Sequence, residues 1–231
     1  MQDVRIIRRI MQNAEQKPPE IKLQTVQPAP AWRWLSERGL RVATGEATLA
    51  RYAMLSAQRF AELEDVIPSD DSVLLILRRG AAVSPGLRAA LTAPLTDAPA
   101  ASGKLHEIVV EYGGSAGPDL SRLAERAGMD TAGYIHSHAA VEYTVAFLGF
   151  QPGFPYLRGL PAGLHAPRRA SPRLRVAAGS VAIGGAYAGI YPAGGPGGWQ
   201  IVGRTAAVLF DPQRHAPALL MPGDRVRFVP T

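Results

Sequence analysis

Four arginines lie within eight positions of one another: Arg168, Arg169, Arg173 and Arg175. A guanidinium group binds carboxylate or phosphate through two parallel hydrogen bonds. Pro167 and Pro172 prevent a helix and keep the segment extended, so at least two of these groups can converge on one anion. A solvated basic loop is the alternative, and composition alone favours it.

A glycine-rich run, residues 194–198, precedes Trp199. Successive backbone N–H groups in such a run can bind an anion. No Gly-Lys-Ser/Thr follows, so the run is not a P-loop. The alternative is a tight barrel turn in which Trp199 fills the core, and the sequence leaves both open.

Three aromatic residues surround Pro152 and Pro155: Phe150, Phe154 and Tyr156. This segment is either a rigid loop that closes a pocket or a hydrophobic corner. We predict that Phe150 packs in the core and that Phe154 and Tyr156 face the pocket.

His136 and His138 form a His-x-His pair, and Glu142 follows four residues after His138. On a helix, His138 and Glu142 share a face. A metal needs a third ligand that the nearby sequence does not offer, so we expect no metal site. Ser180 is not in a Gly-x-Ser-x-Gly elbow, which favours a hydroxyl that binds substrate or closes a turn over a nucleophile.

The composition favours small anions as ligands. The net charge is +6 and Lys+Arg number 25, of which only Lys17, Lys22 and Lys104 are lysines. The arginines are scattered without interleaved aromatic residues, so we expect no nucleic-acid partner. No stretch approaches the ~20 apolar residues of a membrane helix. Arginines interrupt the apolar residues at the N-terminus, unlike a signal peptide. With no cysteine in the chain, we expect a cytoplasmic protein without a membrane partner.

The order of predicted elements indicates an α+β protein in three parts. Residues 1–31 contain four prolines and are predicted to be an extension or linker. Residues 32–104 are predicted to form a small α+β domain. Its expected elements are a strand at Leu40–Thr44, a helix at Ala47–Phe60, strands at Asp65–Ile67 and Val73–Leu77, a helix at Leu87–Leu91 after Ser84–Pro85, and a linker at Thr92–Gly103.

Residues 105–231 are predicted to form a β barrel, because many short β-prone runs are separated by Gly/Pro clusters. The expected strands are His106–Tyr112, Tyr143–Leu148, Val181–Ile183, Gly189–Tyr191, Gln200–Gly203, Val208–Phe210 and Arg225–Val229. Helices are expected at Pro118–Ala127 and Thr131–His138.

Four segments of this half resemble, in order, the signature of one family. They are Tyr112–Gly114 with Gly117–Leu120; Phe147–Leu157; Pro167–Arg169 with Ser171–Arg173 and Ala178–Val181; and Gly189–Pro192 with Pro196–Thr205, Phe210–Pro212 and Pro222–Asp224. The family is that of the 5-oxoprolinase subunit PxpB, also called KipI or allophanate hydrolase subunit 1, of the carboxyltransferase subdomain C and D type. It includes the equivalent part of urea amidolyases.

The resemblance implies a ferredoxin-like N-terminal domain followed by a cyclophilin-like β barrel. It also implies a subunit of an ATP-dependent 5-oxoprolinase, which opens 5-oxoproline to glutamate with a larger PxpC-like subunit and a PxpA-like protein. The family pattern makes His138 the candidate acid or base, and Arg169 and Arg173 the catalytic anion-binding residues. The remaining candidates, for substrate binding, are Phe154, Tyr156, Ser180, Gly197, Gly198, Trp199 and Gln200.

A lactam amide is a poor electrophile, and phosphate transfer to its oxygen would create a leaving group. Fixed arginine charge is what such a step needs. The chain lacks a P-loop lysine and a convincing Asp/Glu pair for magnesium, so ATP and magnesium are expected to be held largely by the partner. The isolated chain is then predicted to be inactive.

The chain departs from the family pattern at a few places. Where the family usually has Val-Pro-Ala-Gly-Ser-Val-Gly-Ile-Ala-Gly, this chain has Val176–Gly185 with alanine at 182 and glycine at 184. An expected Gln-Thr is Tyr187–Ala188, and the acidic residue common in the Tyr-Gly-Gly loop is Ser115. These differences leave two alternatives open. One is a KipI-like inhibitor of a histidine kinase, and the other is a subunit of an allophanate or urea amidolyase-type enzyme.

Overall fold

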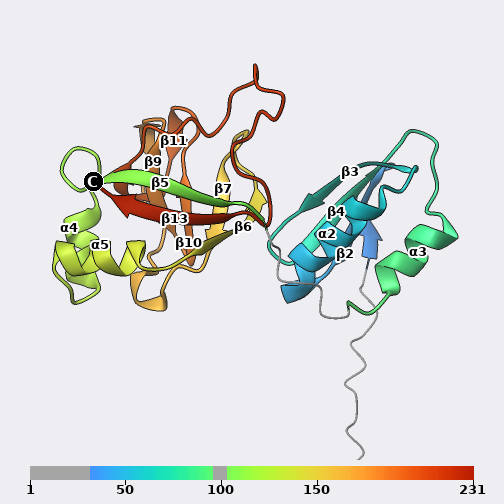
Figure 1. The fold of residues 1–231 in the computed structure, drawn as a ribbon, viewed down its shortest axis with the longest axis horizontal. Helices are drawn as coiled ribbons and strands as arrows, with labels where there is room; N and C mark the ends of the chain where they lie inside the picture. Colours follow the sequence, from blue (N-terminus) through green and yellow to red (C-terminus); the bar gives the residue numbers. More distant parts are fainter. Residues whose placement is uncertain (1–31, 96–102) are drawn as a thin grey trace, which may run out of the picture.

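A computed structural model describes residues 32–95 and 103–231, which form two sheet systems with separate hydrophobic cores (Figure 1). The predicted extension, residues 1–31, lies outside the described residues, and so do residues 96–102 of the predicted linker.

The first unit is an antiparallel sheet, ordered β1-β2-β4-β3, with two helices. Its elements are β1 (Trp32–Trp34), β2 (Gly39–Ala43), η1 (Gly45–Ala47), α2 (Thr48–Gln58), β3 (Leu63–Pro68), β4 (Ser72–Leu77) and α3 (Pro85–Thr92). Alternate residues of β4, such as Val73 and Leu75, are buried in the same core as Leu55 of α2 and Leu87 of α3. As the sequence predicts, Ser84 caps α3 by accepting a hydrogen bond from the Leu87 N–H at 3.0 Å.

The run β2–α2–β3–β4–α3 follows the βαββαβ order of a ferredoxin-like fold up to its last strand. β1 precedes this run instead of following it, and it pairs with β2 at the edge of the sheet. The sequence does not predict β1, because three residues are too few to show an alternating pattern.

The second unit is a closed barrel with the strand order β10-β7-β6-β13-β5-β12-β9, and β10 and β9 also pair. Its strands are β5 (Leu105–Tyr112), β6 (Tyr143–Leu148), β7 (Pro155–Arg158), β9 (Ser180–Gly184), β10 (Tyr187–Ile190), β12 (Gln200–Arg204) and β13 (Arg225–Pro230). The other elements are α4 (Leu120–Arg126), α5 (Thr131–Ala139), η2 (Ala162–Leu164) and a separate two-stranded ribbon of β8 (Arg173–Val176) and β11 (Gly195–Gly197). These observations confirm the predicted α+β class and barrel.

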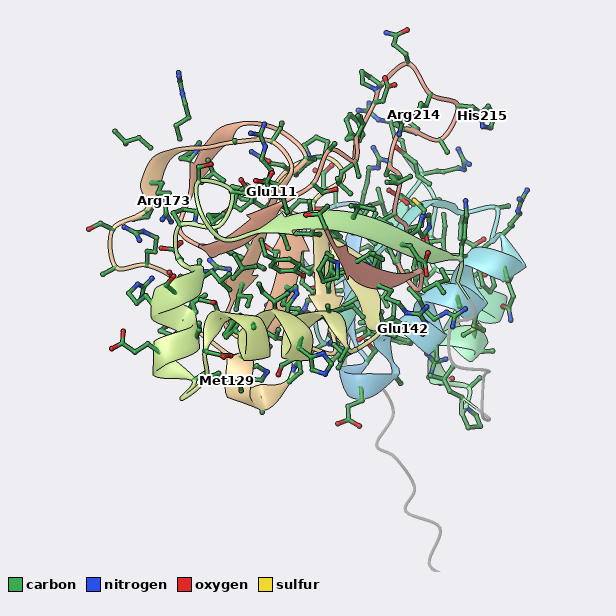
Figure 2. All side chains as sticks on the ribbon, turned by 60° about the vertical axis from the view of Figure 1, so that its left-hand side comes forward. Glu111, Met129, Glu142, Arg173, Arg214 and His215 are labelled. Atoms are coloured by element: carbon green, nitrogen blue, oxygen red, sulfur yellow. The ribbon has the colours of Figure 1, made fainter. Side chains whose placement is uncertain are left out.

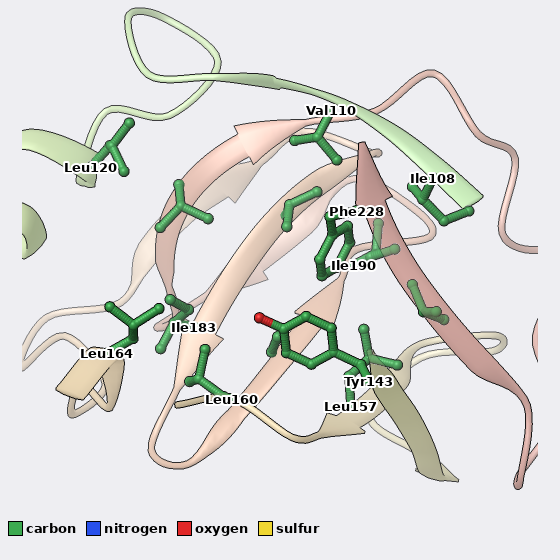
Figure 3. Close-up of a cluster of buried hydrophobic side chains, with 14 of the residues drawn as sticks. Ile108, Val110, Leu120, Tyr143, Leu157, Leu160, Leu164, Ile183, Ile190 and Phe228 are labelled. Atoms are coloured by element: carbon green, nitrogen blue, oxygen red, sulfur yellow. The ribbon is translucent and has the colours of Figure 1, made fainter. Parts of the chain in front are cut away.

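Side chains from all around the barrel fill its interior, among them Val110, Tyr143, Ile183 and Phe228 (Figure 3). α4 and α5 pack against each other, and they contact β12 and β13 respectively. Asp130 caps α5 by accepting a hydrogen bond from the Gly133 N–H at 2.7 Å.

One predicted strand is wrong. Val208–Phe210 is not part of a strand, and Phe210 forms only an isolated bridge with Ala218. Three strands of the second unit were not predicted, namely β7, β8 and β11. β7 begins with proline and β11 reads Gly-Pro-Gly, so their strand conformation comes from pairing with neighbours and not from local propensity. Within the described residues, each helix is too short or too polar to cross a membrane.

Candidate anion-binding site

Three arginines converge on the buried carboxylate of Asp119, a group that we call the Asp119 cluster: Asp119, Arg122, Arg169 and Arg173. Arg173 Nη2 lies 3.0 Å from the carboxylate, and Arg122 Nη2 and Arg169 Nη1 each lie 3.3 Å from it. The Asp119 side chain is 4% exposed, whereas those of Arg122, Arg169 and Arg173 are 54%, 34% and 23% exposed. The cluster therefore has a buried acceptor and solvent-facing donors, and Figure 2 shows Arg173 near the start of α4.

Asp119 is held by β12 as well as by the arginines. Its backbone N–H donates to the Ile201 carbonyl at 3.0 Å, and its carboxylate accepts from the Ile201 N–H at 2.7 Å. These two bonds fix the residue that precedes α4 against the middle of a barrel strand.

Burial by itself would raise the pKa of Asp119, but the hydrogen bonds and charges around the carboxylate outweigh it. The hydrogen bonds from Arg173 and from the Ile201 N–H are the largest of these, and the net result is a lowered pKa. Asp119 is therefore ionised at neutral pH, and it holds three guanidinium groups close together despite their mutual repulsion.

Gln200 joins α4 to the arginine segment. Its Oε1 accepts from Arg122 Nη2 at 2.6 Å, and its Nε2 donates to the Pro167 carbonyl at 2.8 Å. Gln200, predicted to bind substrate, is 3% exposed and instead positions the surrounding arginines.

The arginine segment and the glycine-rich run lie side by side in the structure. Arg173 on β8 pairs with Gly197 on β11, and the Arg169 N–H donates to the Gly198 carbonyl at 2.7 Å. A Cβ at Gly197 would collide with the Tyr191 hydroxyl, so the strand can approach this ring only with glycine here. The glycines thus serve as a close-packed strand, which is the structural one of the two alternatives.

The prediction for the aromatic loop is wrong for two of its residues. Phe154 is 1% exposed and packs with Tyr191 and Trp199, whereas Phe150 is 61% exposed. Phe150 has a φ of 64°, in the left-handed region that non-glycine residues rarely adopt, and this turns its side chain outward. Tyr156 is half-buried, with its ring 5.5 Å from that of Trp199.

Trp199 forms the floor beneath the arginine segment, because the Arg168 guanidinium lies 5.7 Å from the centre of its ring. The Trp199 ring lies so close to Gly184 that a Cβ there would collide with it. Gly184 stands where the family pattern has alanine, and Ala182 packs beside Trp199 in the same core. This departure therefore affects how the floor packs.

His138 lies in the barrel core, apart from the Asp119 cluster. It is 0% exposed and contacts three rings in what we call the His138 cluster: His138, Tyr112, Tyr143 and Phe228. Burial lowers the pKa of His138 to about 3. A neutral imidazole without solvent access cannot exchange protons with a ligand, so the structure contradicts the predicted acid–base role.

Two other predicted features are not brought together with the arginines. Ser180 pairs with Arg204, whereas Gln200 pairs with Ile183, so Ser180 lies at the opposite end of β9 from Gln200. Glu142 lies beyond the end of α5 and forms ion pairs with Arg225 and Arg227. In the described ranges, no group of three His, Asp or Glu side chains could hold a metal ion.

A groove of about 600 Å³ lies elsewhere, between β5 and the segment that follows β12. Its lining includes Glu107, Val109 and Thr205 but none of the residues of the Asp119 cluster. The cluster is thus an open, charged surface site and not a closed pocket.

Sequence reasoning missed Asp119 and Arg122. Asp119 belongs to the Gly-Pro-Asp-Leu segment of the family signature, which was the available signal. A lone aspartate 50 residues before Arg169 gives no other indication of its role.

An α+β protein with a seven-stranded closed barrel and a carboxylate-anchored arginine site defines the class of this chain. The family model for the carboxyltransferase domain, subdomain C and D, matches residues 30–220, so the chain belongs to this family. The resemblance seen in the motifs is thereby confirmed.

Individual relatives agree with this assignment. The chain is 59% identical over 124 residues to the PxpB-type 5-oxoprolinase subunit of Escherichia coli O157:H7, a match that covers 54% of this chain and 57% of that protein. The chain thus spans little more than half the length of this curated relative. The crystal structure of TTHA0988 is 34% identical with a TM-score of 0.72, over 84% of this chain and 40% of that one. The urea amidolyase of K. lactis, at 20% identity and a TM-score of 0.65 over 90% of this chain and 16% of that one, shows the shared fold alone.

Proposed function

We propose that this chain is a subunit of an ATP-dependent 5-oxoprolinase, which opens 5-oxoproline to glutamate together with a larger PxpC-like subunit and a PxpA-like protein. The observation that carries the proposal is the Asp119 cluster, in which three arginines face outward from one buried carboxylate. The Escherichia coli relative, whose name is that of a 5-oxoprolinase subunit, supplies the substrate class.

In this proposal Arg169 and Arg173 bind an anionic group of the reactants, either the substrate carboxylate or a phosphate of ATP. A guanidinium carries five N–H donors, and Asp119 occupies only part of this capacity. Because Asp119 pre-arranges the two groups, they need little reorganisation when the anion binds. Trp199 and Tyr156 close the apolar side of the site.

Magnesium does not fit the Asp119 cluster. A carboxylate has about four lone-pair sites, and Asp119 already accepts from three arginines and the Ile201 N–H. We therefore propose that the partner subunit holds the magnesium of ATP, and that the chain alone lacks substrate-dependent ATP hydrolysis.

The test is ADP release with and without 5-oxoproline, measured on the chain alone and on the chain co-purified with its larger subunit and the PxpA-like protein. We expect release above background only in the complete mixture. Substrate-dependent hydrolysis by the lone chain would overturn the proposed division of labour, and an inactive complete mixture would overturn the substrate.

A matched pair of variants then tests the site. Arg173→Ala is expected to lower kcat/KM by about 100-fold, in line with the loss of a charged donor at a reacting group. Its stability should change little, because Asp119 keeps its other donors and Arg173 Nη1 is buried without a partner in the described structure. Arg175→Ala, an exposed neighbour on β8, is the control and should stay near wild type. Equal losses in both variants would indicate a non-specific charge effect.

A further inference from the structure

Asp70, in the turn between β3 and β4, reaches from the first unit to the barrel. Its carboxylate accepts from Arg158 Nη2 at 2.6 Å and from the Tyr187 hydroxyl, and its backbone carbonyl also accepts from Arg158. We call Asp70, Arg158 and Tyr187 the Asp70 clamp.

The two barrel residues of the clamp are brought together by strand pairing. Arg158 ends β7 and Tyr187 begins β10. Leu157 pairs with Ala188, so the residues on either side of this pair lie next to each other at one end of the two strands. One carboxylate can therefore accept from both side chains at once.

A series of ring contacts leads from Tyr187 to the Asp119 cluster. The rings of Tyr187 and Tyr156 meet edge to face at 5.7 Å and 83°. Tyr156 meets Trp199 in the same way at 5.5 Å and 78°. Trp199 in turn lies beneath Arg168, next to Arg169. Edge-to-face pairs depend on orientation, so a change in the angle of one ring is passed to the next.

The clamp sets orientation more than it adds stability. The hydrogen bond from Tyr187, followed by that from Arg158, lowers the pKa of Asp70, so its carboxylate is charged at neutral pH. The side chains of Asp70 and Arg158 are 59% and 37% exposed, and exposed pairs contribute little to folding. The Tyr187 hydroxyl, however, is held by Asp70 in a fixed direction.

We propose that Asp70 is a positioning residue: from the first unit it fixes Tyr187, and through Tyr156 and Trp199 it sets the apolar wall of the arginine site. The consequence for substrate binding rests on the proposed function, whereas the consequence for the rings does not. Tyr187 and Ala188 stand where the family pattern has Gln-Thr, so this device belongs to this chain's own sequence.

Asp71 provides a matched control in the same turn. It is an exposed aspartate that pairs with Arg41 of the first unit at 2.8 Å. Asp70→Ala and Asp71→Ala therefore each remove one carboxylate and one arginine contact, but only the former breaks a contact with the barrel.

The first experiment needs no activity. The chain is labelled with fluorotyrosine, and the fluorine NMR signals of Tyr156 and Tyr187 are assigned with Tyr156→Phe and Tyr187→Phe. Asp70→Ala should move both signals, Asp70→Asn should move them less because an acceptor remains, and Asp71→Ala should leave them unchanged. Unmoved signals in Asp70→Ala overturn the proposal, whatever the activity.

The second experiment uses the complete complex. Asp70→Ala should raise the KM for 5-oxoproline about 5-fold, equivalent to about 1 kcal/mol, with kcat nearly unchanged. Asp71→Ala should leave both constants near wild type. An unchanged KM beside moved NMR signals would overturn the link from the rings to the substrate. If the wild-type complex is inactive, the proposed function fails while the NMR result still decides the role of Asp70 in positioning the rings.

Discussion

The Asp119 cluster and the His138 cluster are both built around a buried ionisable side chain, but they differ in their partners. Asp119, at 3% exposure, is surrounded by charged donors that extend to the surface. His138, at 0% exposure, has one hydrogen bond, 2.8 Å from its Nδ1 to the Tyr112 hydroxyl, and is otherwise packed against rings.

The partners decide whether burial keeps or removes a charge. Around Asp119, hydrogen bonds and arginine charge overcome desolvation, so the carboxylate stays ionised. Around His138 nothing offsets desolvation, and its Nε2 has no hydrogen-bond partner in the described structure. A charge that persists and reaches solvent can act on a ligand, whereas a neutral ring sealed in a core can only pack.

Asp119→Ala should have the largest effect on this contrast. It leaves the buried Ile201 N–H without its acceptor and three arginines facing one another, so we expect destabilisation of about 3 kcal/mol. Activity of the complex should fall more than about 100-fold because Arg169 and Arg173 lose their shared anchor. Chemical denaturation and ADP release measure the two effects.

Asp119→Asn separates charge from shape, since it keeps the size of the side chain and one acceptor oxygen. It should recover part of the stability but little of the activity. Asp211→Ala is the control, because Asp211 pairs with Arg214 at 3.4 Å on the surface. Wild-type activity in Asp119→Asn would show that the carboxylate charge is not needed at the site.

His138→Leu should change the pH dependence of stability and leave the chemistry alone. The unfolded chain takes up a proton on His138 below pH 6.5, whereas the folded chain stays neutral down to about pH 3. The unfolded state thus binds more protons in this window, and stability falls as the pH falls, by up to about 1.4 kcal/mol per unit. His138→Leu should flatten this slope in denaturation curves.

The exposed His136 on the same helix provides the control, and His136→Leu should keep the wild-type slope. Turnover of the complex near neutral pH should be retained in both variants. A selective loss of turnover in His138→Leu, with normal folding, would restore the acid–base hypothesis and remove the contrast between the two clusters.

The sequence predicts the parts of the fold that have strong local patterns. α2, α3, α5 and the strands β4, β6 and β13 coincide with periodic or capped segments. The short strands β1, β7, β8 and β11 have no such pattern, because their conformation depends on partners distant in the sequence.

The site was predictable in its charges but not in its organisation. The proline-spaced arginines pointed to Arg169 and Arg173, and the structure brings them together. Spacing could not show that Asp119 anchors them, since that contact depends on how α4 docks on β12. Composition could not order the burial of Phe150 and Phe154 either, because a left-handed backbone at Phe150 decides it.

Arg168→Ala should have the smallest effect and so marks the outer limit of the Asp119 cluster. Arg168 is exposed and touches the site only through the face of Trp199, at 5.7 Å. Such a contact contributes about 0.5–1 kcal/mol, so the KM for 5-oxoproline should rise about 2-fold to 5-fold with kcat and stability unchanged. Arg168→Lys keeps a cation over the ring and should restore part of the affinity, whereas Arg168→Gln should not. A loss as large as that of Asp119→Ala would mean that Arg168 itself binds the reacting anion. The carboxylate-anchored arginines would then be a structural support, and the functional surface would lie one residue further out along the segment.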